Sequence, residues 1–173
     1  IDEAITENDI NQLIEKYYPE HQDQLLSLLD LEDPRLAMDH LTTNQQTLCP
    51  SIFIARSLAK NGNNVYQYHF TRMREGSEKI LSYHGAEIPY VFNTHDEWLP
   101  TNEDDAQLTE AMMEYWIEFA KKGTPNSINN PTWKEFGTEE NYLILDLPLL
   151  NSSKLENEFC EIMINELVQR ANY

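Results

Sequence analysis

The chain has 173 residues, of which 40% are hydrophobic and 10% aromatic, a composition typical of a globular protein. Its formal net charge of −18 argues against nucleic acid or an anionic membrane surface as a partner. No run of residues approaches the ~20 apolar positions that a membrane-spanning helix needs. No signal peptide is visible at the start, and because residue 1 is Ile, the chain looks processed or excerpted.

The first part of the chain is predicted to be helical. Thr6 can cap a first helix, with Asp9 at the position where a capping box places an acidic residue. Apolar residues then recur at helical spacing up to Tyr18, and Pro19 ends the pattern. Further helices are expected over residues 22–29, 35–45 and 50–60.

The rest of the chain combines helices with two predicted strands. Residues 65–70 are rich in β-branched and aromatic side chains and predict a strand, followed at 71–83 by a polar stretch long enough to suggest a functional loop. The other predicted elements are a short turn around Val91, an amphipathic helix at 105–122 ended by Gly123, a loop or sheet edge at 133–136, a strand at 142–145 and a helix at 155–167. Because two strands alone make a marginal unit, we expect them to join a larger sheet supplied elsewhere.

Five histidines are candidates for acid–base chemistry. Four have ordinary interpretations: a surface position for His21, a structural position inside a helix for His40, a strand position compatible with the core for His69, and a polar loop for His95. None of the serines lies in a G-x-S-x-G elbow, and no phosphate-loop, dinucleotide-binding or metal-ligand pattern is present. The sequence therefore predicts no cofactor and no metal.

His84 differs from the other four in its setting. It lies in the loop after the clearest strand, followed by Gly85 and an apolar segment at 88–92. Loops at strand ends are where rigid sheets hold catalytic groups, and histidine changes charge near neutral pH. From these residues alone, a catalytic and a structural role for His84 both remain open.

The segment 83–92, Tyr-His-Gly-Ala-Glu-Ile-Pro-Tyr-Val-Phe, resembles the histidine motif of type-B carboxylesterases and cholinesterases. That motif reads His-Gly-x-Glu, then an apolar residue and a Phe-containing segment. Other stretches similar to this family follow in the same order: Leu-Cys-Pro at 48–50, the strand at 66–70, the segment 112–126, and Trp133 with the strand that ends before Asp146. The similarity covers roughly residues 6–170.

The resemblance implies that residues 1–173 are the C-terminal part of a single α/β-hydrolase catalytic domain. Its fold class would be α/β, with mostly helical segments and a few strands that complete a larger mixed sheet. The family implies a Ser-Glu-His triad, in which His84 would be the catalytic histidine and Glu87 either a supporting group or an exposed loop acid. The serine elbow and the triad acid would lie in the N-terminal part of the same enzyme. The implied activity is that of a serine carboxylesterase acting on a carboxylic ester.

The two cysteines gain a meaning from the same resemblance. By count alone, Cys49 and Cys160 are two free thiols, but they resemble a bonded pair found in secreted cholinesterase-like proteins. A disulfide implies a secreted or periplasmic location. Ala86 departs from the acetylcholinesterase version of the motif, which has tyrosine there, so a general carboxylesterase fits better than a choline esterase. The alternative is a non-catalytic cholinesterase-like module used in adhesion or binding, because such relatives keep the fold and lose triad members.

Overall fold

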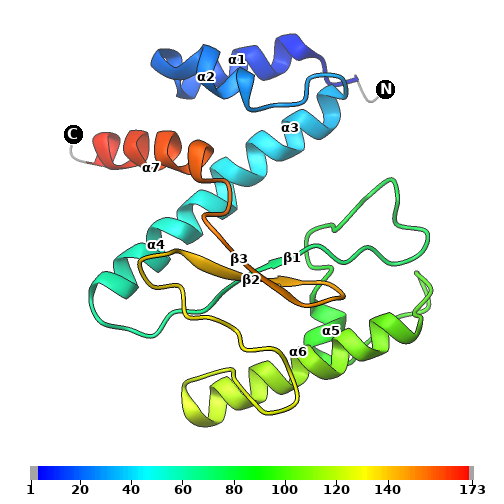
Figure 1. The fold of residues 1–173 in the computed structure, drawn as a ribbon. Helices are drawn as coiled ribbons and strands as arrows, with labels where there is room; N and C mark the ends of the chain where they lie inside the picture. The colour runs from blue at the N-terminus through cyan, green and yellow to red at the C-terminus, as the bar shows by residue number, and fades with distance from the viewer. Residues whose placement is uncertain (1–3, 172–173) are drawn as a thin grey trace. The chain divides into compact units, whose positions relative to one another are not determined.

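The computed structural model of the protein describes residues 4–171, and the chain divides into two compact units (Figure 1). The helical unit contains the described residues up to Ser57 together with those from Glu156 onward. The sheet unit contains Leu58–Leu155. About half of the chain is helical, and its strands form one small mixed sheet, so the predicted α/β composition is confirmed at this level.

The helical unit contains α1 (Glu7–Tyr17), α2 (Gln22–Ser27), α3 (Pro34–Thr43), most of α4 (Cys49–Lys60) and α7 (Asn157–Ala171), with a 3₁₀ turn at Pro19–His21 and a π-helical turn at Asn44–Leu48. The predicted capping box of α1 is present, because the Thr6 amide donates to Asp9 Oδ2 at 2.8 Å and the Asp9 amide donates to Thr6 Oγ1 at 3.4 Å. Ile10 and Ile14 of α1 are completely buried, as their spacing predicts.

A disulfide joins Cys49 at the start of α4 to Cys160 in α7. His40 of α3 reinforces the same region, with its Nε2 atom 3.1 Å from Glu156 and its ring 4.9 Å from that of Phe159. The structural role expected for His40 is therefore confirmed. The disulfide and these contacts hold α7 within the helical unit.

The sheet unit contains three strands in the order β1–β2–β3 and two helices. Their bounds are β1 Gln67–Phe70, α5 Ile88–Phe92, α6 Glu103–Lys122, β2 Asn141–Leu145 and β3 Leu150–Ser153. β1 and β2 are parallel with Gln67 opposite Tyr142, whereas β2 and β3 are antiparallel with Asn141 opposite Ser153. Because β1 and β2 are parallel, their carboxyl ends lie at the same edge of the sheet.

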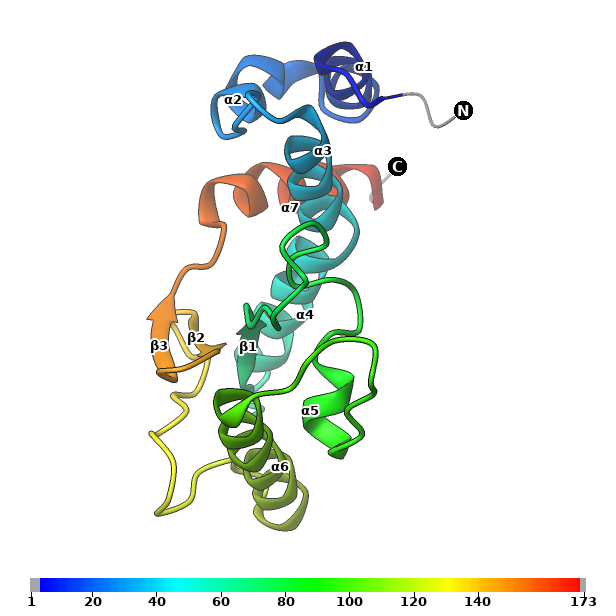
Figure 2. The same cartoon turned by 90° about the vertical axis from the view of Figure 1, so that its right-hand side faces the viewer.

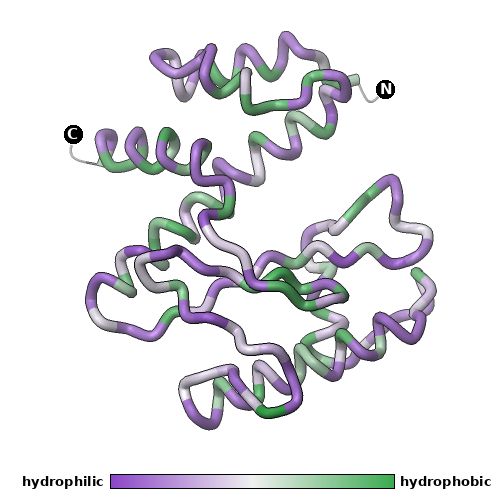
Figure 3. Tube along the Cα trace, viewed as in Figure 1, coloured by the Kyte–Doolittle hydropathy of each residue, from purple (hydrophilic) through white to green (hydrophobic). Residues whose placement is uncertain are grey.

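The core of the sheet unit lies between the sheet and the two helices. It is formed by apolar residues that are at least nine-tenths buried: Tyr90 of α5, Leu108, Ala111, Met112 and Tyr115 of α6, Trp133, and Leu143 and Leu145 of β2. The trace is strongly apolar along the second half of β2 (Figure 3). α5 packs against α6 in this arrangement (Figure 2).

Three sequence-based expectations differ from the structure. β3 was not predicted, because Leu-Asn-Ser-Ser lacks strand-forming residues and is ordered by pairing with β2. β1 begins at Gln67, two residues after the predicted start, because the Val65 carbonyl instead accepts from the amide of Phe136 at 2.8 Å. The expected short turn around Val91 is the helix α5.

Candidate functional site

His84 lies in the connection between β1 and α5, within a tight turn at residues 83–86. The turn is closed by a hydrogen bond of 2.9 Å from the Ala86 amide to the Tyr83 carbonyl. Gly85 has a φ of +83°, which side-chain-bearing residues rarely adopt, so glycine at this position allows the turn. Ala86 is buried while His84 is exposed, so the turn anchors its alanine and presents its histidine to solvent.

The ring of His84 has no hydrogen-bond partner among residues 4–171. A triad histidine needs an acid at one ring nitrogen and a serine hydroxyl at the other. Both nitrogens of the imidazole are therefore free of hydrogen bonds within this range.

Glu87 is half-buried at the start of α5, where its carbonyl accepts from the amides of Tyr90 and Val91 at 3.0 and 3.1 Å. Its carboxylate has no hydrogen-bond partner among the described residues, so the supporting role expected for Glu87 stays a prediction. Burial, and after it the Glu87 charge, raises the pKa of Tyr68 on β1, so the two side chains are near each other. Both line an open apolar hollow of about 510 Å³ with Phe92 and Trp116.

A buried carboxylate connects the two ends of the loop that carries His84. Asp105 in the first turn of α6 is 0% exposed, and its Oδ1 atom accepts from Arg72 Nε at 2.8 Å and from the Tyr90 hydroxyl at 2.7 Å. Burial raises the pKa of Asp105, but the hydrogen bonds from Arg72, the Asn102 amide and Tyr90 outweigh it, so the net pKa is lowered. The sequence predicts Asp105 at the N-terminus of this helix, but no sequence pattern indicates that Arg72 and Tyr90 donate hydrogen bonds to it.

A second arginine holds the middle of the same loop. Arg74 is 5% exposed and donates to the Leu99 carbonyl at 3.2 Å. It also donates to the hydroxyl of Tyr83, the neighbour of His84, at 3.4 Å, and it lies 3.5 Å from an oxygen of Asp96. The loop is thus fixed from inside by charged groups that the sequence alone did not single out.

The remaining histidines lie in different settings. His21 is half-buried with its Nε2 3.7 Å from Glu166, and His69 on β1 is exposed, so a core position for His69 is wrong. His95 is not a simple loop residue, because its Nε2 lies 2.7 Å from Thr109 Oγ1 and its ring packs 4.8 Å from that of Tyr90. Within residues 4–171, no cluster of histidine, cysteine and acidic side chains is arranged to hold a metal ion.

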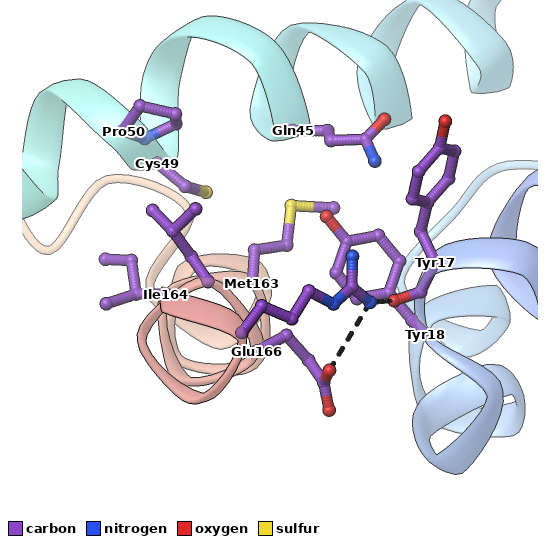
Figure 4. A pocket seen from close by; sticks show the side chains of 10 residues that line it. Tyr17, Tyr18, Gln45, Cys49, Pro50, Met163, Ile164 and Glu166 are labelled. Atoms are coloured by element: carbon purple, nitrogen blue, oxygen red, sulfur yellow. Dashed lines mark hydrogen bonds and ion pairs between the residues drawn. The ribbon is translucent and has the colours of Figure 1, made fainter. Parts of the chain in front are cut away.

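A separate hollow of about 190 Å³ lies in the helical unit (Figure 4). Its walls are largely apolar, and among the residues that line it Arg170 of α7 donates to the Tyr17 carbonyl and to Glu166. The Arg170 guanidinium also lies 5.7 Å from the centre of the Tyr18 ring. These contacts fasten the end of α7 to α1, and the hollow contains no nucleophile or base arranged for catalysis.

None of the helices between residues 4 and 171 combines the length and apolar character needed to cross a bilayer.

Comparison with known proteins agrees with this geometry. The model of the carboxylesterase family matches residues 3–163. Mouse carboxylesterase 1D is 26% identical over 180 residues, which cover 98% of this chain and 30% of that protein. Human cocaine esterase is 41% identical over 66 residues, covering 37% of this chain and 12% of that protein. A medium-chain fatty acyl-CoA hydrolase precursor from Anas platyrhynchos is 29% identical over 116 residues, covering 64% of this chain and 21% of that protein.

A mixed sheet flanked by helices, with a histidine turn after its first strand, is the arrangement expected of an α/β-hydrolase fragment. The match over most of its length shows that the chain belongs to the carboxylesterase family. The chain spans less than a third of the length of the curated relatives it matches.

Proposed function

We propose that the protein containing this chain is a carboxylic ester hydrolase that uses a Ser-Glu-His triad, with His84 as its general base and acid. The observation that carries the proposal is the position of His84: an exposed imidazole on a tight turn, after the carboxyl end of β1, in a member of the carboxylesterase family. Open α/β sheets bind their ligands at the carboxyl ends of their strands.

The proposed mechanism follows from the chemistry of an imidazole beside a hydroxyl. One ring nitrogen of His84 accepts the serine proton as the serine oxygen attacks the ester carbonyl carbon. When the tetrahedral intermediate collapses, the protonated ring donates that proton to the departing alcohol. The ring then takes a proton from water as the water oxygen attacks the acyl carbon. When this second intermediate collapses, the ring returns the proton to the serine oxygen, and the carboxylic acid is released. The triad acid would accept a hydrogen bond from the opposite ring nitrogen. Glu87 would be a supporting group near the site and not the triad acid.

We also propose that the N-terminal part of the same enzyme packs against the sheet unit and supplies the serine and the acid. Two observations support this. No described strand lies on the outer side of β1. The hollow beside Glu87 exposes large apolar side chains, among them Phe92 at 68% exposure and Ile88 at 51%. Exposed apolar patches of this kind mark contact surfaces.

A secreted or periplasmic location is proposed on the strength of the Cys49–Cys160 disulfide. Disulfides form and persist in oxidising compartments and are rare in the cytosol. Cell fractionation checks the proposal, and recovery of the protein with both thiols free from the cytosol would contradict it.

The function is tested with the full-length protein and p-nitrophenyl esters. His84→Ala is expected to lower kcat by on the order of 10⁴-fold or more, because a triad fails when its base is removed. A serine-directed organophosphate should abolish the wild-type activity. His21→Ala is the matched control, since it removes a histidine of the helical unit. Unchanged hydrolysis by the His84 variant rejects the proposed triad, and inactive wild-type protein favours the non-catalytic binding module.

A further inference from the structure

The placement of the His84 ring depends on the backbone of its loop. No side chain among residues 4–171 hydrogen-bonds to the ring, and the ring is exposed. A catalytic base works only when it is held within hydrogen-bonding reach of the proton it takes. Whatever fixes the loop between β1 and α5 therefore fixes the position of the His84 backbone, from which the imidazole projects, before any partner segment is added.

Asp105 binds both ends of that loop through a single oxygen. Arg72 lies just after β1 and Tyr90 lies in α5, within the histidine motif, and both donate to Asp105 Oδ1, at 2.8 and 2.7 Å. The carboxylate itself is held at the start of α6, where the Asn102 amide donates to Asp105 Oδ2 at 3.0 Å and the Asp105 amide donates to Asn102 Oδ1 at 3.1 Å. We name the three residues Arg72, Asp105 and Tyr90 the Asp105 clamp.

Two further hydrogen bonds hold the chain on either side of the His84 turn. Ser82, two residues before the histidine, donates from its Oγ to the Phe70 carbonyl at the end of β1, at 3.1 Å. On the other side, the amide of Tyr90 donates to the Glu87 carbonyl at 3.0 Å, which joins α5 to the end of the motif. The turn therefore lies between two anchored points. One is Ser82, bonded to the end of β1 two residues before Arg72, and the other is Glu87, bonded to Tyr90 of the clamp.

We propose that the Asp105 clamp positions His84 for catalysis, and that the hydroxyl of Tyr90 acts as a positioning group through it. The inference rests on the proposed catalytic role of His84. Tyr90 touches no reacting atom in this scheme, and its ring is fixed independently by packing 5.2 Å from Phe70. Removing only the hydroxyl should therefore loosen the loop and leave the core in place. A misplacement of about 1 Å at a catalytic group can cost about 100-fold in rate.

The test compares Tyr90→Phe with Tyr115→Phe in the full-length enzyme. Tyr115 is the matched control, because it is also completely buried in the same core and its hydroxyl donates to the Pro131 carbonyl at 2.7 Å. Each variant loses one hydrogen bond of a buried tyrosine, but only Tyr90 is a member of the clamp. The melting temperature of both variants is measured, and active sites are counted by stoichiometric labelling with a fluorogenic organophosphate.

Tyr90→Phe is expected to lower kcat per labelled site by about 10- to 100-fold with little change in KM, because the ring of His84 is displaced while the substrate pocket is intact. Tyr115→Phe is expected to keep its kcat. Equal losses in the two variants, or a normal kcat in Tyr90→Phe, overturn the inference. Full activity of His84→Ala would instead overturn the proposed function, so the two failures are distinguishable.

A second variant keeps the inference testable if Tyr90→Phe does not fold. Arg72→Lys retains the positive charge near Asp105 but loses the rigid guanidinium that bonds to Oδ1 from the side of β1. Arg72→Lys is expected to lower kcat at unchanged KM in the same way as Tyr90→Phe. A normal kcat in folded Arg72→Lys counts against the clamp.

Discussion

Cys49 and Cys160 are joined by a disulfide although 111 positions separate them in the chain. In the entropic model, closing a loop of about this length stabilises the folded protein by about 4.7 kcal/mol, because the unfolded chain loses conformational entropy. Removing a native disulfide from a small secreted domain typically costs about 2–5 kcal/mol of stability. The bond holds α7 against the start of α4, where Cys49 and Cys160 are both almost completely buried.

The first prediction concerns that bond. Replacing both cysteines by alanine in the full-length protein is expected to lower the free energy of unfolding by about 2–5 kcal/mol, measured by urea denaturation. The double variant is preferred because a single change leaves a buried, unpaired thiol. Peptide mapping of the unreduced wild type should recover residues 49 and 160 in one linked fragment. Recovery of two separate, alkylated peptides would contradict the disulfide.

The second prediction concerns the buried ion pair of Asp105. Asp105→Ala is expected to destabilise the protein by about 3–5 kcal/mol, because it leaves the guanidinium of Arg72 buried without its closest carboxylate. Asp104→Ala is the matched control in the same helical turn, since that carboxylate is exposed and 3.9 Å from Arg72, and it should cost less than about 1 kcal/mol. Equal effects of the two substitutions in urea denaturation would contradict the prediction.

The lowered pKa of Asp105 also predicts how the stability of the protein changes at acid pH. The pKa of Asp105 is lowered in the folded protein from a reference value of 3.8, so the unfolded chain binds its proton more readily. The stabilisation is therefore complete above pH 3.8 and is lost as the pH falls through the lower folded value. Asp105→Asn should unfold with a weaker dependence on pH in this acid range.

The sequence was most informative where local chemistry alone determines the structure. Thr6 with Asp9 predicted the start of α1, and Lys122 followed by Gly123 predicted the end of α6. These signals act through neighbouring backbone groups, so they need no knowledge of the rest of the fold. His84 was predicted to lie in the loop after β1, and it does, but only the family resemblance singled it out as a catalytic candidate.

Features that depend on tertiary contacts were not predictable in this way. β3 is a strand because it pairs with β2, and its own residues resemble a turn. Asp105 looked like an ordinary acid at a helix start, yet it accepts hydrogen bonds from residues 15 and 33 positions away in the chain. Phe119 has the spacing of a core residue of α6 but is 47% exposed, because Tyr66 and its other neighbours in the described chain cover only part of its ring.

The third prediction concerns the protonation of His95. Thr109 already donates its hydroxyl hydrogen to the Asp105 carbonyl at 2.7 Å, so it accepts from His95 Nε2, and the proton of a neutral ring is assigned to that atom. The other nitrogen, Nδ1, is buried without a hydrogen-bond partner among the described residues, so a second proton there would be poorly accommodated. Burial, and after it the charge of Arg74, lowers the pKa of His95, although Asp105 and Asp96 act in the opposite direction.

A histidine with a lowered folded pKa contributes stability that is present above its unfolded value of 6.5 and is lost as the pH falls through the folded value. The full-length protein should therefore lose stability as the pH falls below 6.5, measured as the denaturation midpoint. His95→Gln, which keeps a donor for Thr109 but cannot titrate, should show a shallower dependence. His21→Gln controls for the loss of a histidine elsewhere, and identical slopes in wild type and His95→Gln would contradict the assignment.

The last prediction compares two glycines that adopt the same left-handed backbone conformation. Gly85 and Gly62 have φ angles of +83° and +79°, so alanine at either position should cost about 1–2 kcal/mol of stability. A Cβ atom at Gly85 would also lie 3.4 Å from Ile88, whereas at Gly62 it would meet nothing within 4 Å. That contact is an ordinary one with the end of a side chain, so the positive φ is what alanine disfavours. Gly85→Ala should therefore shift the backbone beside His84, and if His84 is the catalytic base, kcat should fall by about 10-fold or more.

Gly62→Ala, in the turn after α4, should lower the melting temperature by a similar amount and leave kcat per active site unchanged. Comparing the pair separates loss of folded protein from loss of catalytic geometry, since only the glycine beside His84 can change both. If Gly85→Ala and Gly62→Ala reduce stability equally and both keep the wild-type kcat, the orientation of the histidine does not depend on this turn.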